Sequence, residues 1–174
     1  MQVRFLPGAQ NMIQAKKIIK IIRNRLNFAL ASGTITILGI MVGLYSGTYM
    51  KSVVIGGIIT VAIADAFSDA LGFHVSREID DPKSKTVIWL STASSFFFKF
   101  FFILTFIIPA ALFSLKTAII VNIIWGFFVI GLVSWNLPLF PKTKKLYIVI
   151  EHLFIASIVI TLTFYAGKLI SSAF

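Results

Sequence analysis

The stretch "SVVIGGIITVAIADAFSDALGFHVS", residues 52–76, decides the fold of this chain. A helix rises about 1.5 Å per residue, so a run of this length crosses the ~30 Å hydrocarbon core of a bilayer. Asp65 and Asp69 are its only acidic residues, and it contains no Lys or Arg. The stretch therefore predicts a membrane-spanning helix that carries two carboxylates inside the membrane.

Four further apolar runs have the length of a membrane span. Of the 174 residues, 58% are hydrophobic and 13% are charged, which is more apolar than an ordinary soluble domain. The connections between the runs are short and leave no room for a soluble domain. We therefore expect an all-α integral membrane protein whose five helices lie in the lipid bilayer, at residues 28–48, 52–76, 86–114, 117–135 and 147–170.

Basic residues set the expected orientation. Most of the 16 Lys and Arg residues lie on the N-terminal side of the predicted membrane, whereas Lys51, Lys116 and Lys168 lie on the other side. Cytoplasmic loops carry the excess of Lys and Arg in membrane proteins. The pattern predicts a protein of the cell membrane with a cytoplasmic N-terminus and an external C-terminus. It also explains the net charge of +10 without a nucleic-acid partner.

Residues 1–26 precede the first span, and part of this segment predicts an amphipathic helix. Over residues 9–26, Met12, Ile19 and Ile22 share one helical face, while Lys16 and Lys20 lie mostly on the other. Such a helix lies in the membrane interface, held by anionic head groups and by ~5–10 Å of apolar burial. The alternative is a basic topology anchor with no further role.

The sequence offers no catalytic site. It has no cysteine, no nucleophile with a base at a usable spacing, no glycine-rich phosphate loop and no histidine pair placed for haem. We expect neither an enzyme nor a permanently bound cofactor.

Three charged residues lie inside the predicted membrane. Each Asp or Lys costs ~2.5–3.5 kcal/mol near the middle of a span, so Asp65, Asp69 and Lys99 need compensation. Asp65 and Asp69 are ~40° apart around their helix, and Lys99 of the third span lies at a similar depth. One interpretation is a structural ion pair between the second and third spans. The other is a site for a divalent cation or a proton, with Lys99 as charge partner or gate.

Other polar and small residues receive weaker assignments. His74 and Glu78 form a candidate pair at the cytoplasmic entrance, with solvated interface residues as the alternative, and Glu151 and His152 are interpreted in the same way. Small residues at every fourth position predict close approach of the first two spans, or of two copies of the chain. These residues are Gly39, Gly43 and Gly47 in the first span and Ala64, Ser68 and Gly72 in the second.

Residues 33–78 resemble the first two spans of the vacuolar iron transporter family. That family has glycines in the first span and the run Ala-Asp/Gly-Ala-x-Ser-Met-x-x-Gly-Glu-Tyr-x-Ser in the second. Pro109 and the closing "TFYAGKLI", residues 163–170, are also similar to the family. The resemblance implies five spans and a homodimer whose first two spans line a shared pathway. The matching positions in the second span are Ala64, Asp65, Ala66, Ser68, Gly72 and Ser76.

The chain also departs from the family pattern. Asp69 stands at the family's methionine, and Ser32 stands at the acidic residue before the first-span glycine. Gly-Glu-Tyr becomes Gly72, Phe73 and His74, and the cytoplasmic metal-binding helices are reduced to "REIDDPKSK", residues 77–85. Replacing a soft thioether by a carboxylate shifts the preference from iron towards harder cations such as Mn²⁺, Ca²⁺ or Mg²⁺, or towards protons alone.

The resulting expectation is a transporter that moves iron-like, manganese-like or harder divalent ions out of the cytoplasm, by proton exchange. Asp65 and Asp69 would bind the metal or the proton, and Lys99 would hold or gate one carboxylate. Two alternatives stay open: a non-transporting membrane protein with a structural Asp/Lys cluster, and a proton pathway without metal. The residues expected to line the pathway are Ser32, Ser68, Gly72 and Ser76.

Overall fold

The computed structural model describes residues 7–80, 85–137 and 144–173, with side chains from residue 26 onwards except that of residue 80. Regular structure in these ranges is helical, which confirms the all-α prediction. The helices are α1 (Pro7–Thr48), α2 (Lys51–Asp80), α3 (Lys85–Leu104), α4 (Ile107–Leu112), α5 (Leu115–Trp135) and α6 (Lys145–Ala173).

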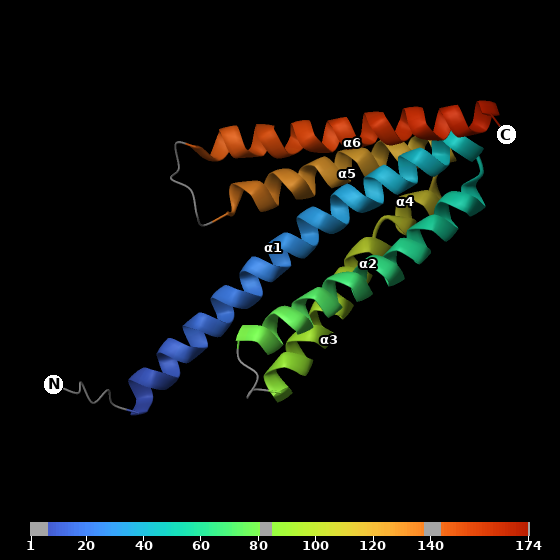
Figure 1. Cartoon of the computed structure of the whole chain (residues 1–174). Helices are drawn as coiled ribbons and strands as arrows, with labels where there is room; N and C mark the ends of the chain where they lie inside the picture. The colour runs from blue at the N-terminus through green and yellow to red at the C-terminus, as the bar shows by residue number, and fades with distance from the viewer. Residues whose placement is uncertain (1–6, 81–84, 138–143, 174) are drawn as a thin grey trace.

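The helices form two antiparallel pairs on either side of α1. Figure 1 shows α1 running between the α2–α3 pair and the α5–α6 pair, and α1 contacts all four of these helices. The chain termini lie at opposite ends of the molecule (Figure 1). We call the end where α2 leads into α3 and α5 into α6 the connection end; α1 begins beyond it.

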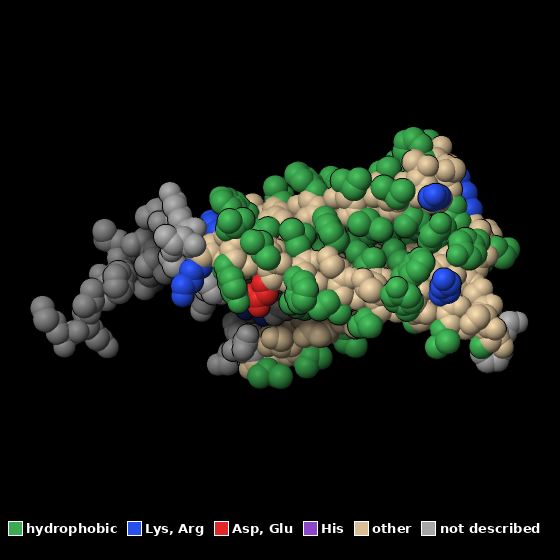
Figure 2. Space-filling model, turned by 90° about the horizontal axis from the view of Figure 1, so that it is seen from above, with side chains coloured by type: hydrophobic (Ala, Val, Ile, Leu, Met, Phe, Trp, Pro, Cys, Tyr) green, Lys and Arg blue, Asp and Glu red, His purple; other side chains and the backbone are tan. Residues whose placement is uncertain are grey.

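Five helical segments in the described ranges are long and apolar enough to span a membrane, which identifies an integral membrane protein. They are Leu26–Thr48, Lys51–Ile79, Lys85–Leu112, Leu115–Trp135 and Lys145–Ala173. Hydrophobic side chains cover the middle of the face seen in Figure 2, whereas Lys and Arg side chains lie towards its ends. This distribution matches a bilayer, with an apolar core between two polar interfaces.

α1 is longer than one membrane span. Its 42 residues extend for about 63 Å, twice the ~30 Å hydrocarbon thickness. The segment 9–26, predicted as an interfacial helix, is helical and continuous with the first span. The side chains on which its amphipathic character depends lie outside the described residues, apart from Leu26.

The third span is broken between α3 and α4. Pro109 lies in the first turn of α4, where its missing N–H costs no intrahelical bond. Before it, Thr105 and Phe106 bond to carbonyls three residues back, as in a 3₁₀ turn. The buried Asn122 of α5 donates a hydrogen bond of 2.9 Å from Nδ2 to the Phe106 carbonyl. A polar side chain thus ties the break to the neighbouring helix.

The first-span glycines pack against α6 rather than against α2. A Cβ on Gly43 would lie 3.4 Å from the Thr163 carbonyl oxygen, and one on Gly47 would lie 3.2 Å from the Gly167 carbonyl oxygen. A Cβ on Gly167 would overlap the Gly43 carbonyl oxygen and the Ser46 hydroxyl group. The α1 backbone therefore approaches α6 closely, as small residues allow in membranes. The expected contact with the second span is not formed by these glycines.

Candidate functional site

The ammonium group of Lys99 lies among three oxygens in the lipid-spanning part of the bundle. It donates a hydrogen bond of 3.0 Å to Ser32 Oγ of α1 and another to Asp69 Oδ2 of α2. It also lies 2.9 Å from Asp65 Oδ2. We call Ser32, Asp65, Asp69 and Lys99 the carboxylate–lysine cluster. Three helices meet in it.

The two carboxylates are held differently. Asp69 Oδ2 accepts hydrogen bonds from Lys99 and, at 3.3 Å, from Ser32 Oγ. Asp65 Oδ2 makes an ion-pair contact with Lys99 but has no partner in hydrogen-bond geometry. Asp69 is therefore fixed by two donors, whereas Asp65 is held mainly by charge attraction.

Helix periodicity and one glycine position the lysine. Asp65 and Asp69 are one turn apart on α2, so both reach the same ammonium group. Lys99 points inward, while Phe97 and Phe101, two residues away on either side, are 55% and 62% exposed. A Cβ on Gly33 would lie 3.1 Å from Lys99 Cε, so the glycine leaves room for the lysine stem.

The lysine is more deeply buried than the two carboxylates. The Lys99 side chain is 0% exposed, whereas those of Asp65 and Asp69 are 21% and 20% exposed. The Oδ1 atom of each aspartate makes no hydrogen bond or ion pair with the described residues. The two carboxylates are therefore less enclosed by the described residues than the lysine that they share.

The predicted pathway residues are not all brought together. Ser32 belongs to the carboxylate–lysine cluster, as described above. Ser68 and Gly72 are exposed on the outer face of α2, and Ser76 is half-buried near the connection end. Of the four residues, only Ser32 makes a hydrogen bond with the charged groups of the cluster among the described residues.

His74 and Glu78 lie one turn apart near the connection end of α2. His74 Nε2 is 3.6 Å from Glu78 Oε1, with side-chain exposures of 14% and 55%. His74 Nδ1 lies 3.0 Å from Thr92 Oγ1 of α3, and the His74 ring packs edge-on against Trp89. Thr92 was not singled out from the sequence, although it lies two turns before Lys99 and hence on the same face of α3.

The other histidine has a similar partner. His152 Nδ1 of α6 lies 2.7 Å from Oγ of the buried Ser134 on α5. The pattern of apolar residues gives no sign of this pairing, because it joins two helices through side chains far apart in the sequence. Among the described residues, no carboxylate lies within ion-pair distance of His152.

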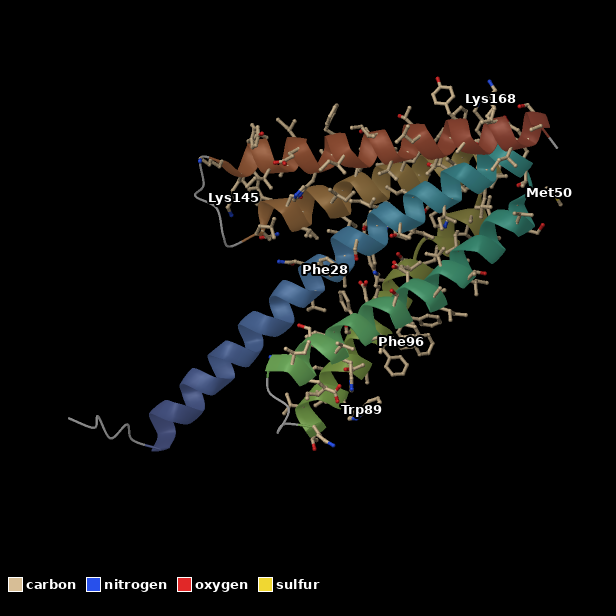
Figure 3. The ribbon with its side chains drawn as sticks, in the orientation of Figure 1. Phe28, Met50, Trp89, Phe96, Lys145 and Lys168 are labelled. Carbon is tan, nitrogen blue, oxygen red and sulfur yellow. The ribbon has the colours of Figure 1, made fainter. Side chains whose placement is uncertain are left out.

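A groove of about 530 Å³ lies between the outer faces of α2 and α3. Its wall is apolar except where His74 and Thr92 meet. Figure 3 shows Trp89 and Phe96 on this side of the pair, turned away from α5 and α6. The other residues that line the groove are aromatic or aliphatic.

No group of three or more His, Cys, Asp or Glu side chains that could hold a metal ion lies within the described residues. The carboxylate–lysine cluster therefore has two acidic ligands and a hydroxyl group for any cation.

Comparisons of this chain with models of protein families, with characterised proteins and with solved structures find no match.

Proposed function

We propose that this protein is a secondary transporter that moves divalent metal ions out of the cytoplasm in exchange for protons. The carboxylate–lysine cluster would be the exchange site. The observation that carries this proposal is the charge balance of the cluster: two carboxylates share the ammonium group of a single lysine, whose side chain is 0% exposed. A purely structural pair would need only one carboxylate.

The uncompensated charge needs a counter-ion. With all three groups ionised, the cluster holds one net negative charge inside an apolar bundle. An unpaired charge there costs ~2.5–3.5 kcal/mol on insertion scales. A proton or a cation removes this cost, so the cluster is built to bind one or the other.

Asp65 would be the carboxylate that exchanges its contact with Lys99 for a contact with the bound ion. Asp69 accepts two hydrogen bonds, whereas Asp65 has only the ion-pair contact with Lys99. A divalent cation bound by the free Oδ1 atoms would repel the ammonium group, and Lys99 would release one proton. The ionised cluster changes from one net negative charge to none: two carboxylates, one neutral amine and one divalent ion. The released proton supplies the counter-transported charge.

Lipid-facing residues of α2 support a homodimer. Ala64, Ser68 and Gly72 are exposed at every fourth position, and a Cβ on Gly72 would have no neighbour within 4 Å. Small residues with this spacing allow two helices to approach closely in a membrane. A second copy on this face would lie beside Asp65 and Asp69. It would supply the cation ligands that this chain lacks within the described residues, and it would give Ser68 and Gly72 a pathway to line.

Two observations favour the rival interpretations. Lys99 already contacts three oxygens, two through hydrogen bonds and the third as an ion pair, which is what a structural cluster in a non-transporting membrane protein requires. The lack of a third acidic or imidazole ligand within the described residues favours a proton pathway without metal.

Flux into liposomes tests these candidates. Proteoliposomes of the wild type, Asp65→Asn, Asp69→Asn and Ser94→Ala would be loaded with a metal-sensitive dye and given Mn²⁺ or Fe²⁺ under an imposed pH gradient. We expect both aspartate variants to lose metal flux while Ser94→Ala, which removes an exposed hydroxyl group bonded only within α3, retains it. Undiminished metal flux in Asp65→Asn and Asp69→Asn would refute the exchange site. Proton flux without metal dependence would support the proton pathway, and no flux with destabilised variants would support the structural cluster.

A further inference from the structure

His74 contacts Thr92 through Nδ1, and the donor in this contact decides where the lone pair of the neutral ring lies. Thr92 Oγ1 lies within hydrogen-bond distance of both the Ile88 carbonyl oxygen, at 2.8 Å, and His74 Nδ1, at 3.0 Å. When its single hydroxyl proton is donated to Ile88, Thr92 accepts a hydrogen bond from Nδ1. In the neutral ring, the lone pair is then on Nε2. That atom faces the Glu78 carboxylate at 3.6 Å.

With the lone pair on Nε2, a cation between this nitrogen and the Glu78 carboxylate would have a ligand on each side. We propose that His74 Nε2 and Glu78 Oε1 bind a divalent transition-metal ion, with Thr92 as the positioning residue. Two ligands that each lie about 2.1 Å from a tetrahedral metal are about 3.4 Å apart, close to the observed separation. Metal-binding histidines usually donate their second ring N–H to a neighbouring acceptor, which fixes the ring for the metal. Thr92 accepts that bond here.

The surroundings favour a bound cation at this place. The His74 ring is held edge-on by Trp89, with ring centroids 4.6 Å apart, so it is oriented before a metal arrives. Glu78 is 55% exposed, which leaves room for water ligands. The pair lies in the last turns of α2, which ends at Asp80, and a helix C-terminus attracts positive charge.

The ligand chemistry identifies the class of ion. One imidazole nitrogen and one carboxylate oxygen suit Fe²⁺, Co²⁺, Ni²⁺ and Zn²⁺, whereas Mg²⁺ and Ca²⁺ prefer oxygen ligands alone. As the place where the transported ion first binds, this site rests on the proposed function and names its cargo class. Metal binding at this site does not depend on transport, because the site is separate from the carboxylate–lysine cluster.

Co²⁺ binding to the purified, tag-free protein in detergent tests the site. Visible absorption of the bound ion and equilibrium dialysis would be measured for the wild type, His74→Asn, Glu78→Gln and Thr92→Val. An asparagine amide can still donate to Thr92 but has no atom in place of Nε2. His152→Asn is the matched control, because His152 has the same kind of hydroxyl partner and no facing carboxylate among the described residues.

In the wild type and in His152→Asn we expect one Co²⁺ site per chain from which Zn²⁺, but not Mg²⁺, displaces the ion; any ion at the carboxylate–lysine cluster adds to this one. His74→Asn and Glu78→Gln lose this ion, and Thr92→Val weakens its binding by about tenfold. Equal binding by the wild type and His74→Asn would overturn the proposal, as would equal losses in His74→Asn and His152→Asn or displacement by Mg²⁺. Asp65→Asn retains the ion, so a failed exchange site and a failed entrance site give different results.

Discussion

Asp65 of α2 and Lys99 of α3 form an ion pair, with 2.9 Å between Oδ2 and Nζ, in which the lysine is 0% exposed. The same ammonium group is hydrogen-bonded to Asp69 and Ser32. Because the pair joins two neighbouring membrane helices, its charges affect stability as well as any transport. The two contributions can be separated by substitution.

Removal of the lysine should destabilise the bundle. Lys99→Met leaves two carboxylates without their cation, and breaking a buried pair costs about 3–5 kcal/mol. The triple variant Asp65→Asn/Asp69→Asn/Lys99→Met removes every charge and should recover most of this loss. Unfolding in mixed micelles, followed by circular dichroism, measures both. Wild-type stability in Lys99→Met would contradict a stabilising role for the pair.

The two aspartates should differ in their structural importance. Asp69 accepts hydrogen bonds from Lys99 and Ser32, whereas Asp65 lacks a bond of this geometry. Hydrogen bonds to charged groups contribute about 1.5–3 kcal/mol, so Asp69→Asn should lower the free energy of unfolding more than Asp65→Asn does. The same unfolding assay compares them side by side. A larger loss in Asp65→Asn would reverse this assignment.

The contact between α1 and α6 should not tolerate a methyl group at Gly167. A Cβ there would overlap the Gly43 carbonyl oxygen and the Ser46 hydroxyl group, so Gly167→Ala should cost about 1–3 kcal/mol or more. Gly56→Ala is the matched control, because no atom lies within 4 Å of a Cβ at Gly56. Thermal unfolding should show a large loss for the first and little change for the second. Similar midpoints for both variants would be incompatible with the close approach.

Both histidines should carry their proton on Nδ1 in the neutral state. Thr92 and Ser134 each lie within hydrogen-bond distance of the carbonyl oxygen four residues earlier, at 2.8 and 2.6 Å. A hydroxyl group that donates its proton to this carbonyl accepts from the Nδ1 atom of its histidine. The chain contains 2 histidines, so ¹⁵N spectra of histidine-labelled protein can be assigned with single variants. Thr92→Val should release His74 alone and Ser134→Ala should release His152 alone. A neutral ring protonated on Nε2 in the wild type would contradict these bonds.

Much of the architecture could be predicted from local sequence. Apolar runs such as residues 52–76 are long enough to cross a bilayer wherever they lie in the chain, so the five spans follow from length and composition alone. The isolated charges of Asp65, Asp69 and Lys99 were conspicuous for the same reason, because an apolar solvent makes each one costly.

The partners of these residues depend on how the helices rotate and cross, which local periodicity does not specify. Gly43 and Gly47 had the spacing of a close contact, but only the packed bundle shows that the contact is with α6. Ser32 joins the lysine because α1 crosses α2 and α3 at that level, and Thr92 reaches His74 across two helices.

Length and hydropathy are therefore enough to predict a five-span helical membrane protein with charges that need neutralising. The packing of the helices shows in addition that two carboxylates share one buried ammonium group and that Thr92 of α3 lies beside His74 of α2. The length of an apolar span is a property of a single helix. The ion pairs and hydrogen bonds described above instead require atoms from several helices to lie within about 3 Å of one another.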